Sequence, residues 1–150
     1  MLELLRVEGL GPKRVKQIYE TLGITTLDEL AVAAQEGQLR QLPTDELFRI
    51  DLEALERSIE DDVRAGLKPC CVIGIAGTTN TGAIDPLRQI AALAARFGLW
   101  FHLDAAYGGF FLLCEEGREA LGDLSQADSI VMDPHKGLGI PYGSGAVLIR

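Results

Sequence analysis

The sequence predicts an α/β protein in which an N-terminal helical bundle is joined to a mostly parallel sheet of about four strands with flanking helices. Up to Pro43 the apolar residues recur at spacings of three and four, which is the helical period. Beyond it, short continuous apolar runs alternate with helical patterns, which is typical of a parallel sheet buried on both faces. We therefore expect a helical module at residues 1–43 and an α/β domain at residues 44–150.

The helical module is expected to contain three short helical segments. The first, Leu2 to Val7, stops at Gly9. Pro12 then stands where the first turn of a helix tolerates a missing N–H, and Gly23 is expected to cap that second helix. A third helix is expected from Thr26 to about Glu36. The apolar face of the second helix consists of Val15, Ile18, Tyr19 and Leu22.

The α/β domain is expected to begin with a helix from Leu52 to Arg64. Its apolar face consists of Leu52, Leu55, Ile59 and Val63. Further helices are expected at residues 86–97 and 116–121. The apolar runs that we expect to form strands lie at residues 71–75, 99–103, 130–132 and 146–149.

The net charge of -8 is distributed unevenly along the chain. Residues 1–43 carry five basic and six acidic side chains, which leaves -7 for the larger part. That larger part shows no cluster of basic residues of the kind that binds nucleic acid.

Membrane and metal sites are not expected from the sequence. No apolar run reaches about 18 residues without a charge, so we expect no membrane partner. The first residues include an acid and no small-residue cleavage site, and we therefore expect a cytoplasmic protein. The cysteines at 70, 71 and 114 lack metal-ligand spacing, and we expect them to be buried as small apolar side chains.

Chemically unusual residues follow three of the expected strands. The first is followed by a loop of glycines and hydroxyls, Gly77 to Gly82. The second ends at Asp104, and the third leads into a run from Asp133 to Gly137 that includes Lys136. Open parallel sheets bind ligands outside the carboxyl ends of their strands. A carboxylate and a lysine at neighbouring strand ends can therefore converge on one ligand.

Three motifs in this part resemble the pyridoxal-phosphate-dependent decarboxylases of the aromatic-amino-acid and glutamate group. They are AGTTNTGAIDP (Ala76 to Pro86), FHLDAAYGG (Phe101 to Gly109) and SIVMDPHKGL (Ser129 to Leu138), in the family's order and separations. PYGSGAVLIR (Pro141 to Arg150) is similar to the strand after the cofactor lysine. The resemblance covers residues 46–150. It implies the large domain of the PLP-transferase fold, pyridoxal 5'-phosphate as cofactor, and a carboxy-lyase (lyase) acting on an amino acid.

The resemblance also implies roles for individual residues, with Lys136, Asp104 and His135 as the catalytic candidates. Lys136 would form a Schiff base with the cofactor aldehyde and exchange it for the substrate amine. Asp104 would keep the pyridine nitrogen protonated. Ala106 would pack against a face of the ring, His135 would lie near the phosphate, and Thr79 would lie near the polar edge of the cofactor.

Each of these residue types also has a structural alternative. A lone aspartate at a strand end usually forms a turn or a helix cap, and a lone lysine is usually solvated. The shared motif context favours the cofactor site for Asp104 and Lys136. For His102 we expect a place in the packing of the sheet instead.

The helical module resembles the helix-hairpin-helix module of bacterial family X DNA polymerases, through LLRVEGLGPKRVKQIYETLGITTLDEL (Leu4 to Leu30). A Gly-Leu-Gly turn lets backbone N–H groups at the start of the next helix face an anion, and nearby basic side chains add charge for phosphate contact. The alternative is a turn that only joins two packed helices. The candidate nucleic-acid-binding residues are Gly9, Leu10, Gly11, Lys13 and Arg14.

The two resemblances meet near Pro43 to Glu46, and each is shortened there. We interpret the chain as a designed chimera, with a recombined chimera or a truncated fused reading frame as alternatives, and we expect weak or no catalysis. Three functions stay open: residual cofactor binding with decarboxylase chemistry, a folded chimera without activity, and weak non-specific contact with DNA. An open sheet also leaves edges and apolar surface uncovered, which favours either a homodimer or aggregation.

Overall fold

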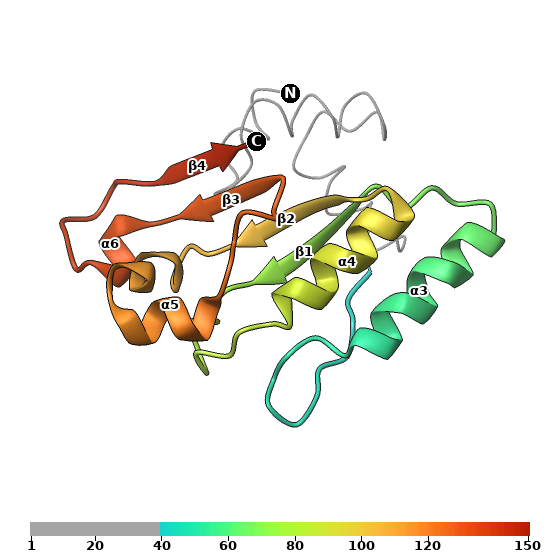
Figure 1. Cartoon of the computed structure of the whole chain (residues 1–150), viewed down its shortest axis with the longest axis horizontal. Coiled ribbons are helices and arrows are strands. Elements are labelled where there is room, and N and C mark those ends of the chain that lie inside the picture. The colour runs from blue at the N-terminus through green and yellow to red at the C-terminus, as the bar shows by residue number, and fades with distance from the viewer. Residues whose placement is uncertain (1–39) are drawn as a thin grey trace. The chain divides into compact units, whose positions relative to one another are not determined.

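A four-stranded sheet of order β1-β2-β3-β4 organises residues 40–150, the part of the chain that the computed structural model describes (Figure 1). Strands β1, β2 and β3 run parallel, and β4 is antiparallel to β3. The prediction of a mostly parallel, four-stranded sheet is therefore confirmed. The strands are β1 (Cys71–Ile75), β2 (Trp100–Asp104), β3 (Ser129–Met132) and β4 (Ala146–Ile149).

Helices flank this sheet, and short ones gather where the parallel strands end. The helices expected at residues 52–64, 86–97 and 116–121 are confirmed, with ends that differ by at most one residue. The sequence analysis did not predict the short helices η2 and α6. The helical elements are α3 (Leu52–Arg64), α4 (Leu87–Phe97), η2 (Gly109–Leu113), α5 (Glu115–Leu121) and α6 (Pro134–Gly137).

Helix α3 begins at a side-chain cap and buries one face. The carboxylate of Asp51 accepts a hydrogen bond of 3.0 Å from the backbone N–H of Ala54, which satisfies a donor that the first turn leaves without a partner. Leu55 and Ile59 are buried. Val63, expected on the same face, is 53% exposed, so the buried face ends one turn before the helix does.

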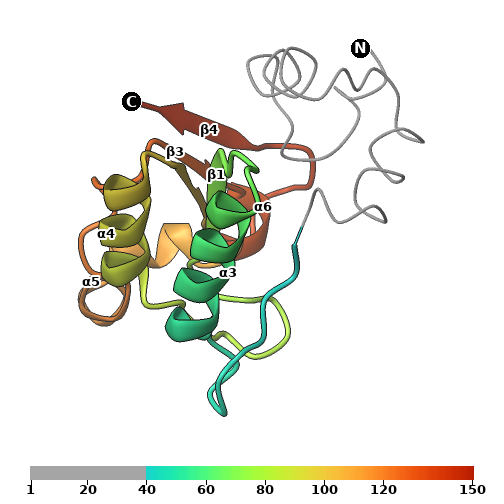
Figure 2. The same cartoon turned by 90° about the vertical axis from the view of Figure 1, so that its right-hand side faces the viewer.

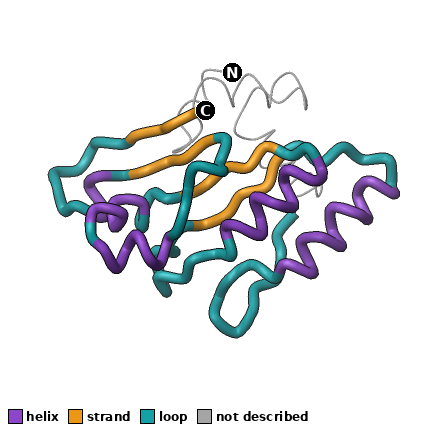
Figure 3. Tube along the Cα trace, in the orientation of Figure 1, coloured by secondary structure: helices purple, strands orange, loops and turns teal. Residues whose placement is uncertain are grey.

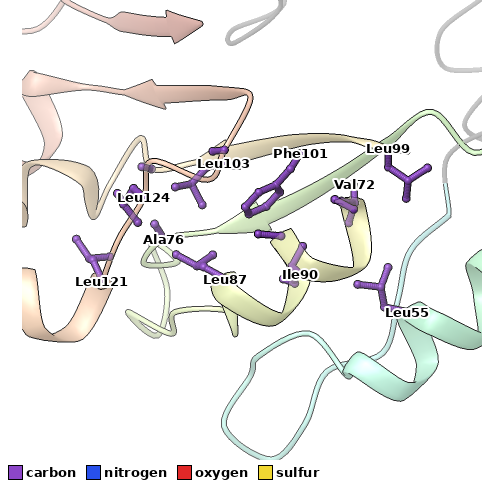
Figure 4. Close-up of a cluster of buried hydrophobic side chains, with 14 of the residues drawn as sticks. Leu55, Val72, Ala76, Leu87, Ile90, Leu99, Phe101, Leu103, Leu121 and Leu124 are labelled. Atoms are coloured by element: carbon purple, nitrogen blue, oxygen red, sulfur yellow. The ribbon is translucent and has the colours of Figure 1, made fainter. Parts of the chain in front are cut away.

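The hydrophobic core lies between α4 and the sheet. Helices α3 and α4 lie side by side in both views (Figures 1 and 2). Ile90 of α4 and Leu103 of β2 are fully buried, and Figure 4 shows them among the labelled core side chains. Full burial of one such side chain stabilises the fold by about 1.5–3 kcal/mol. The core therefore fixes the strands whose ends carry the unusual residues.

A buried carboxylate ties the start of the domain to the end of β1. Asp85 accepts a hydrogen bond of 2.7 Å from the backbone N–H of Ile50 and one of 2.8 Å from that of Ile75. It is only 9% exposed. Both oxygens thus serve backbone donors that are far apart in sequence, and the role of Asp85 is structural.

The sheet face opposite α4 is partly open among residues 40–150. Ile73, His102, Ser129 and Ile149 form one row across the strands. Ile73 and Ile149 are 55% and 46% exposed, so the expected burial of both faces does not hold in the described part. His102 is buried, with its Nδ1 2.8 Å from Ser129 Oγ, which confirms its expected place in the sheet packing.

The expectation of buried cysteines is wrong, because all three thiols are exposed. Cys70 precedes β1, and Cys71 is its first residue. Cys71 lies two residues before Ile73 and shares the open face of the sheet with it. Cys114 precedes α5, with its thiol 3.2 Å from the carbonyl oxygen of Phe111. Within residues 40–150 no helix is long and apolar enough to cross a membrane.

The predictions for the helical module rest mainly on residues 1–39, outside the described part of the chain, and they stay predictions. They concern the three helical segments, the helix-hairpin-helix module at residues 1–43, its boundary with the domain at 44–150, and the candidate DNA site. The residues of that site are Gly9, Leu10, Gly11, Lys13 and Arg14.

Candidate functional site

The carboxyl ends of β1, β2 and β3 meet at one edge of the sheet, where η2, α5 and α6 also lie (Figures 1 and 3). Backbone hydrogen bonds join these ends step by step. The N–H of Ala76 donates to the carbonyl of Asp104 at 2.8 Å, and the N–H of Ala105 donates to that of Val131 at 3.0 Å. The N–H of Asp133 donates to the carbonyl of Ala106 at 3.2 Å. The strand ends that the sequence singled out are therefore neighbours.

Asp104 is the last residue of β2 and lies between Ile75 and Val131 of the flanking strands. The side chain turns back on its own loop, because Oδ1 accepts a hydrogen bond of 3.1 Å from the N–H of Ala106. Within the described residues this is the single hydrogen bond to its carboxylate. The half-buried carboxylate therefore retains capacity to accept a further donor.

Lys136 lies in α6, the short helix that follows β3. Pro134 occupies the first turn, where its missing N–H costs nothing. The N–H of Lys136 donates to the carbonyl of Asp133 at 3.0 Å, which closes the turn. Lys136 Nζ lies 2.8 Å from Asp133 Oδ2, and the two side chains are 34% and 8% exposed. The turn thus places an ammonium against a buried carboxylate.

His135 has one ring nitrogen in use and one without a partner. Nδ1 lies 2.6 Å from the carbonyl oxygen of Ser144, which can only accept, so Nδ1 carries the proton. Nε2 is buried without a hydrogen bond in the described part of the chain. The ring also contacts Tyr142 edge to face, with centroids 4.7 Å apart. A buried polar atom without a partner marks a position where a ligand group fits.

The loops after β1 and β2 approach one another backbone to backbone. A Cβ at position 108 would lie 2.0 Å from the carbonyl oxygen of Ala76, so only glycine fits there. Gly77 has a φ of +90°, and a Cβ there would lie 3.2 Å from Gly108 Cα. This close approach brings the hydroxyl-rich loop after β1 to the same edge as Asp104.

Thr79 is an exposed member of the predicted cofactor residues. It lies in the loop after β1, in which Thr78 Oγ1 and Thr81 Oγ1 are 2.6 Å apart. The hydroxyls that hydrogen-bond to each other in this loop are therefore those of Thr78 and Thr81. Ala106, by contrast, is half-buried and joins both strand ends through its backbone N–H and carbonyl.

The structure brings Asp104, Ala106, His135 and Lys136 to one edge and leaves Thr79 at its exposed margin. The sequence analysis missed Asp133 as the partner of Lys136 and Gly108 as the point of closest approach. A spacing of three residues could have indicated the ion pair, had a helical turn been expected there. Residues 40–150 contain no group of three or more His, Cys, Asp or Glu side chains that could hold a metal ion.

Comparison with known protein families gives one match across most of the chain. A model described as the pyridoxal-dependent decarboxylase conserved domain matches residues 12–150. This match begins upstream of residue 46, where the resemblance was expected to start, and includes the expected junction near Pro43 to Glu46. The predicted polymerase-like module and the chimera therefore receive no support from it.

Individual relatives agree with the family match. An aromatic-L-amino-acid decarboxylase from Bacillus atrophaeus is 45% identical over 113 residues, which cover 75% of this chain and 24% of that protein. An aspartate 1-decarboxylase from Aliivibrio fischeri is 38% identical over 140 residues, covering 93% of this chain and 24% of that protein. The chain thus spans about a quarter of the length of these curated relatives.

Solved structures show the same likeness in three dimensions. The crystal structure of mouse CSAD superposes with a TM-score of 0.73 at 40% identity, covering 78% of this chain and 25% of that one. The crystal structure of Oryza sativa TDC with PLP gives a TM-score of 0.71 at 33% identity, covering 82% and 27%. The sheet and its flanking helices therefore match a fold found in these proteins.

Proposed function

The chain belongs to the pyridoxal-dependent decarboxylase family, and from this premise we propose that it contributes the cofactor-holding edge of an amino-acid carboxy-lyase. The observation that carries the proposal is a lysine and a carboxylate at neighbouring strand ends. Lys136 follows β3 and Asp104 ends β2, and the hydrogen bond from Asp133 to Ala106 joins their loops. The activity of the whole enzyme is part of the proposal, because the chain spans about a quarter of its relatives.

The residues at this edge fit pyridoxal phosphate. Lys136 supplies the primary amine that an aldehyde needs, Asp104 retains capacity to accept a hydrogen bond, and His135 Nε2 is a buried polar atom without a partner in the described part. When bound, pyridoxal phosphate takes up the electron pair released as the substrate carboxylate leaves as CO₂. The TDC structure from Oryza sativa contains this cofactor, which supports the same choice here.

Lys136 is the residue that we propose to hold the cofactor covalently. Its side chain is 34% exposed, so reagents can reach the amine from solution. A lysine amine condenses with an aldehyde and exchanges that bond for a substrate amine. The place of Lys136 on a hydrogen-bonded turn fixes the origin of its long side chain, which favours attachment of the cofactor at this site.

Asp104 is the residue that we propose to hold a proton on the cofactor ring nitrogen. A carboxylate that accepts an N–H bond favours the charged form of its donor. The small side chain of Ala106 leaves room for a ring face, and His135 and Thr79 are proposed near the phosphate and the polar edge. Asp104 would thereby keep the cofactor ring electron-poor while Lys136 gives up its bond to the cofactor in exchange for the substrate amine.

The substrate class is an α-amino acid. One relative is named for aromatic amino acids and another for aspartate, so the family alone leaves the side-chain preference open. The apolar edge strand β4, with Val147, Leu148 and Ile149 each about half exposed, supports the expectation of a homodimer. No observation on residues 40–150 favours contact with DNA.

A spectroscopic titration tests the proposal. Full-length wild-type protein, Lys136→Ala and the matched control Lys68→Ala are titrated with pyridoxal phosphate, and the visible absorption is recorded. We expect a new visible band in the wild type and in Lys68→Ala, and no such band in Lys136→Ala. CO₂ release from aromatic and acidic amino acids then reports the reaction. An identical band in wild type and Lys136→Ala would contradict the proposal.

A further inference from the structure

Asp133 is a buried carboxylate that has no role in the proposed function. It is 6% exposed, and its side chain does not cap the helix that it precedes. Its Oδ2 lies 2.8 Å from Lys136 Nζ instead. A carboxylate is almost never buried to this extent unless it is paired, so the ion pair accounts for its position.

Three segments of the chain hold the Asp133 carboxylate in place. The residue follows β3, and its N–H donates to the carbonyl of Ala106 in the loop after β2, at 3.2 Å. From the other side the stretch before β4 approaches closely, since a Cβ at Gly145 would lie 3.1 Å from Asp133 Oδ1. The carboxylate therefore has little freedom to turn away from Lys136.

Within residues 40–150, Asp133 is an acidic group in direct contact with this lysine. Helix α6 packs against η2, whose residues Gly109–Leu113 carry no titratable side chain. Gly137 packs against the loop that contains Tyr107. Among residues 40–150, Asp104 at the end of β2, His135 and Tyr142 are further titratable groups at this edge.

We infer that Asp133 is a positioning residue that holds the Lys136 ammonium in place and sets the pH at which this lysine becomes reactive, an inference that rests on the proposed function. A lysine must lose its proton before it can attack an aldehyde carbon, and an adjacent carboxylate favours the protonated form. Asp133 thus fixes the direction of the amine and shifts its reactivity to higher pH.

Competitive acetylation of the full chain without cofactor tests this inference. Trace acetic anhydride labels the amines at a series of pH values, and peptide mapping follows Lys136, with exposed Lys68 as an internal reference. In Asp133→Asn we expect the midpoint of Lys136 labelling to fall by about one pH unit while Lys68 is unchanged. The matched control is Asp123→Asn, which removes an equal charge from an exposed site and leaves the Lys136 midpoint unchanged. An unchanged or higher Lys136 midpoint in Asp133→Asn overturns the inference.

A second variant decides the question if Asp133→Asn fails to fold by circular dichroism. Gly145→Ala keeps every charge but places a methyl group 3.1 Å from Asp133 Oδ1, so the carboxylate has to move by a few tenths of an ångström relative to Lys136. We expect a smaller shift in the same direction, and no shift in a folded Gly145→Ala protein then overturns the inference. Absence of the cofactor band in the wild type would count against the proposed function alone, because acetylation needs no cofactor.

Discussion

Asp85 and Asp104 are two carboxylates near the ends of adjacent strands, and their oxygens are used differently. Asp85 accepts backbone hydrogen bonds of 2.7 and 2.8 Å on its two oxygens and is 9% exposed. Asp104 accepts one bond of 3.1 Å and is more exposed. A carboxylate whose two oxygens both accept backbone hydrogen bonds stabilises the fold. A carboxylate that can still accept a further hydrogen bond can bind a ligand.

The largest expected effect is the loss of stability in Asp85→Ala. Two backbone N–H groups would lose a charged acceptor, and each such bond is worth about 1.5–3 kcal/mol. We therefore expect a loss of about 3–6 kcal/mol in the free energy of unfolding, measured by urea denaturation at neutral pH. A loss below about 1 kcal/mol would show that Asp85 contributes little to the stability of the fold, and it would contradict the proposed difference between Asp85 and Asp104.

Asp104→Asn should separate ligand binding from folding. The amide oxygen can still accept the bond from Ala106, so we expect the free energy of unfolding to fall by less than about 1 kcal/mol. Loss of the charge that we propose to face the ring nitrogen should weaken binding of pyridoxal phosphate about tenfold or more. Both quantities are measured on one preparation, by urea denaturation and by absorption titration. Unchanged affinity would show that Asp104 does not face the cofactor.

The smallest expected effect is on the pH dependence of stability, and it concerns Asp45. Both oxygens of this carboxylate accept hydrogen bonds from residues Leu47 and Arg49. Hydrogen bonds from the Arg49 side chain, then from the backbone of Arg49 and Leu47, lower the pKa of Asp45. A lowered pKa in the folded state stabilises the fold above the unfolded-state pKa, and this stabilisation is lost as the pH falls through the folded-state pKa. Asp45→Asn should therefore lose less stability than the wild type on acidification. Urea denaturation at about pH 6 and pH 3 measures this, and an equal loss in both proteins would contradict it.

Most of the fold was predictable because it depends on local patterns. Within residues 40–150, the alternation of apolar runs and helical periods placed each strand and each longer helix within one residue of its observed ends. The exposed cysteines and Ile73 were not predictable in the same way. An apolar residue in a strand indicates that one face can be buried, but the pattern does not say which part of the chain covers that face.

The candidate site was predicted less completely than the fold. The motif context indicated Asp104 and Lys136, and the structure brings their loops together. The Asp133–Lys136 ion pair needed the four-residue helix α6, which is too short to give a periodic signal. The role of Asp85 depends on Ile50, a partner 35 residues away, and such a contact leaves no local pattern. The proposed roles of Ala106, His135 and Thr79 stay predictions.

The central claim is that the strand-end edge holds pyridoxal phosphate on one lysine, and reduction with borohydride tests it most directly. Wild-type protein is incubated with pyridoxal phosphate, reduced, digested and mapped by mass spectrometry. The account predicts that the label lies on Lys136 in clear preference to Lys13, Lys16 and Lys68. A label spread evenly over the four lysines, or absent from Lys136, would contradict it.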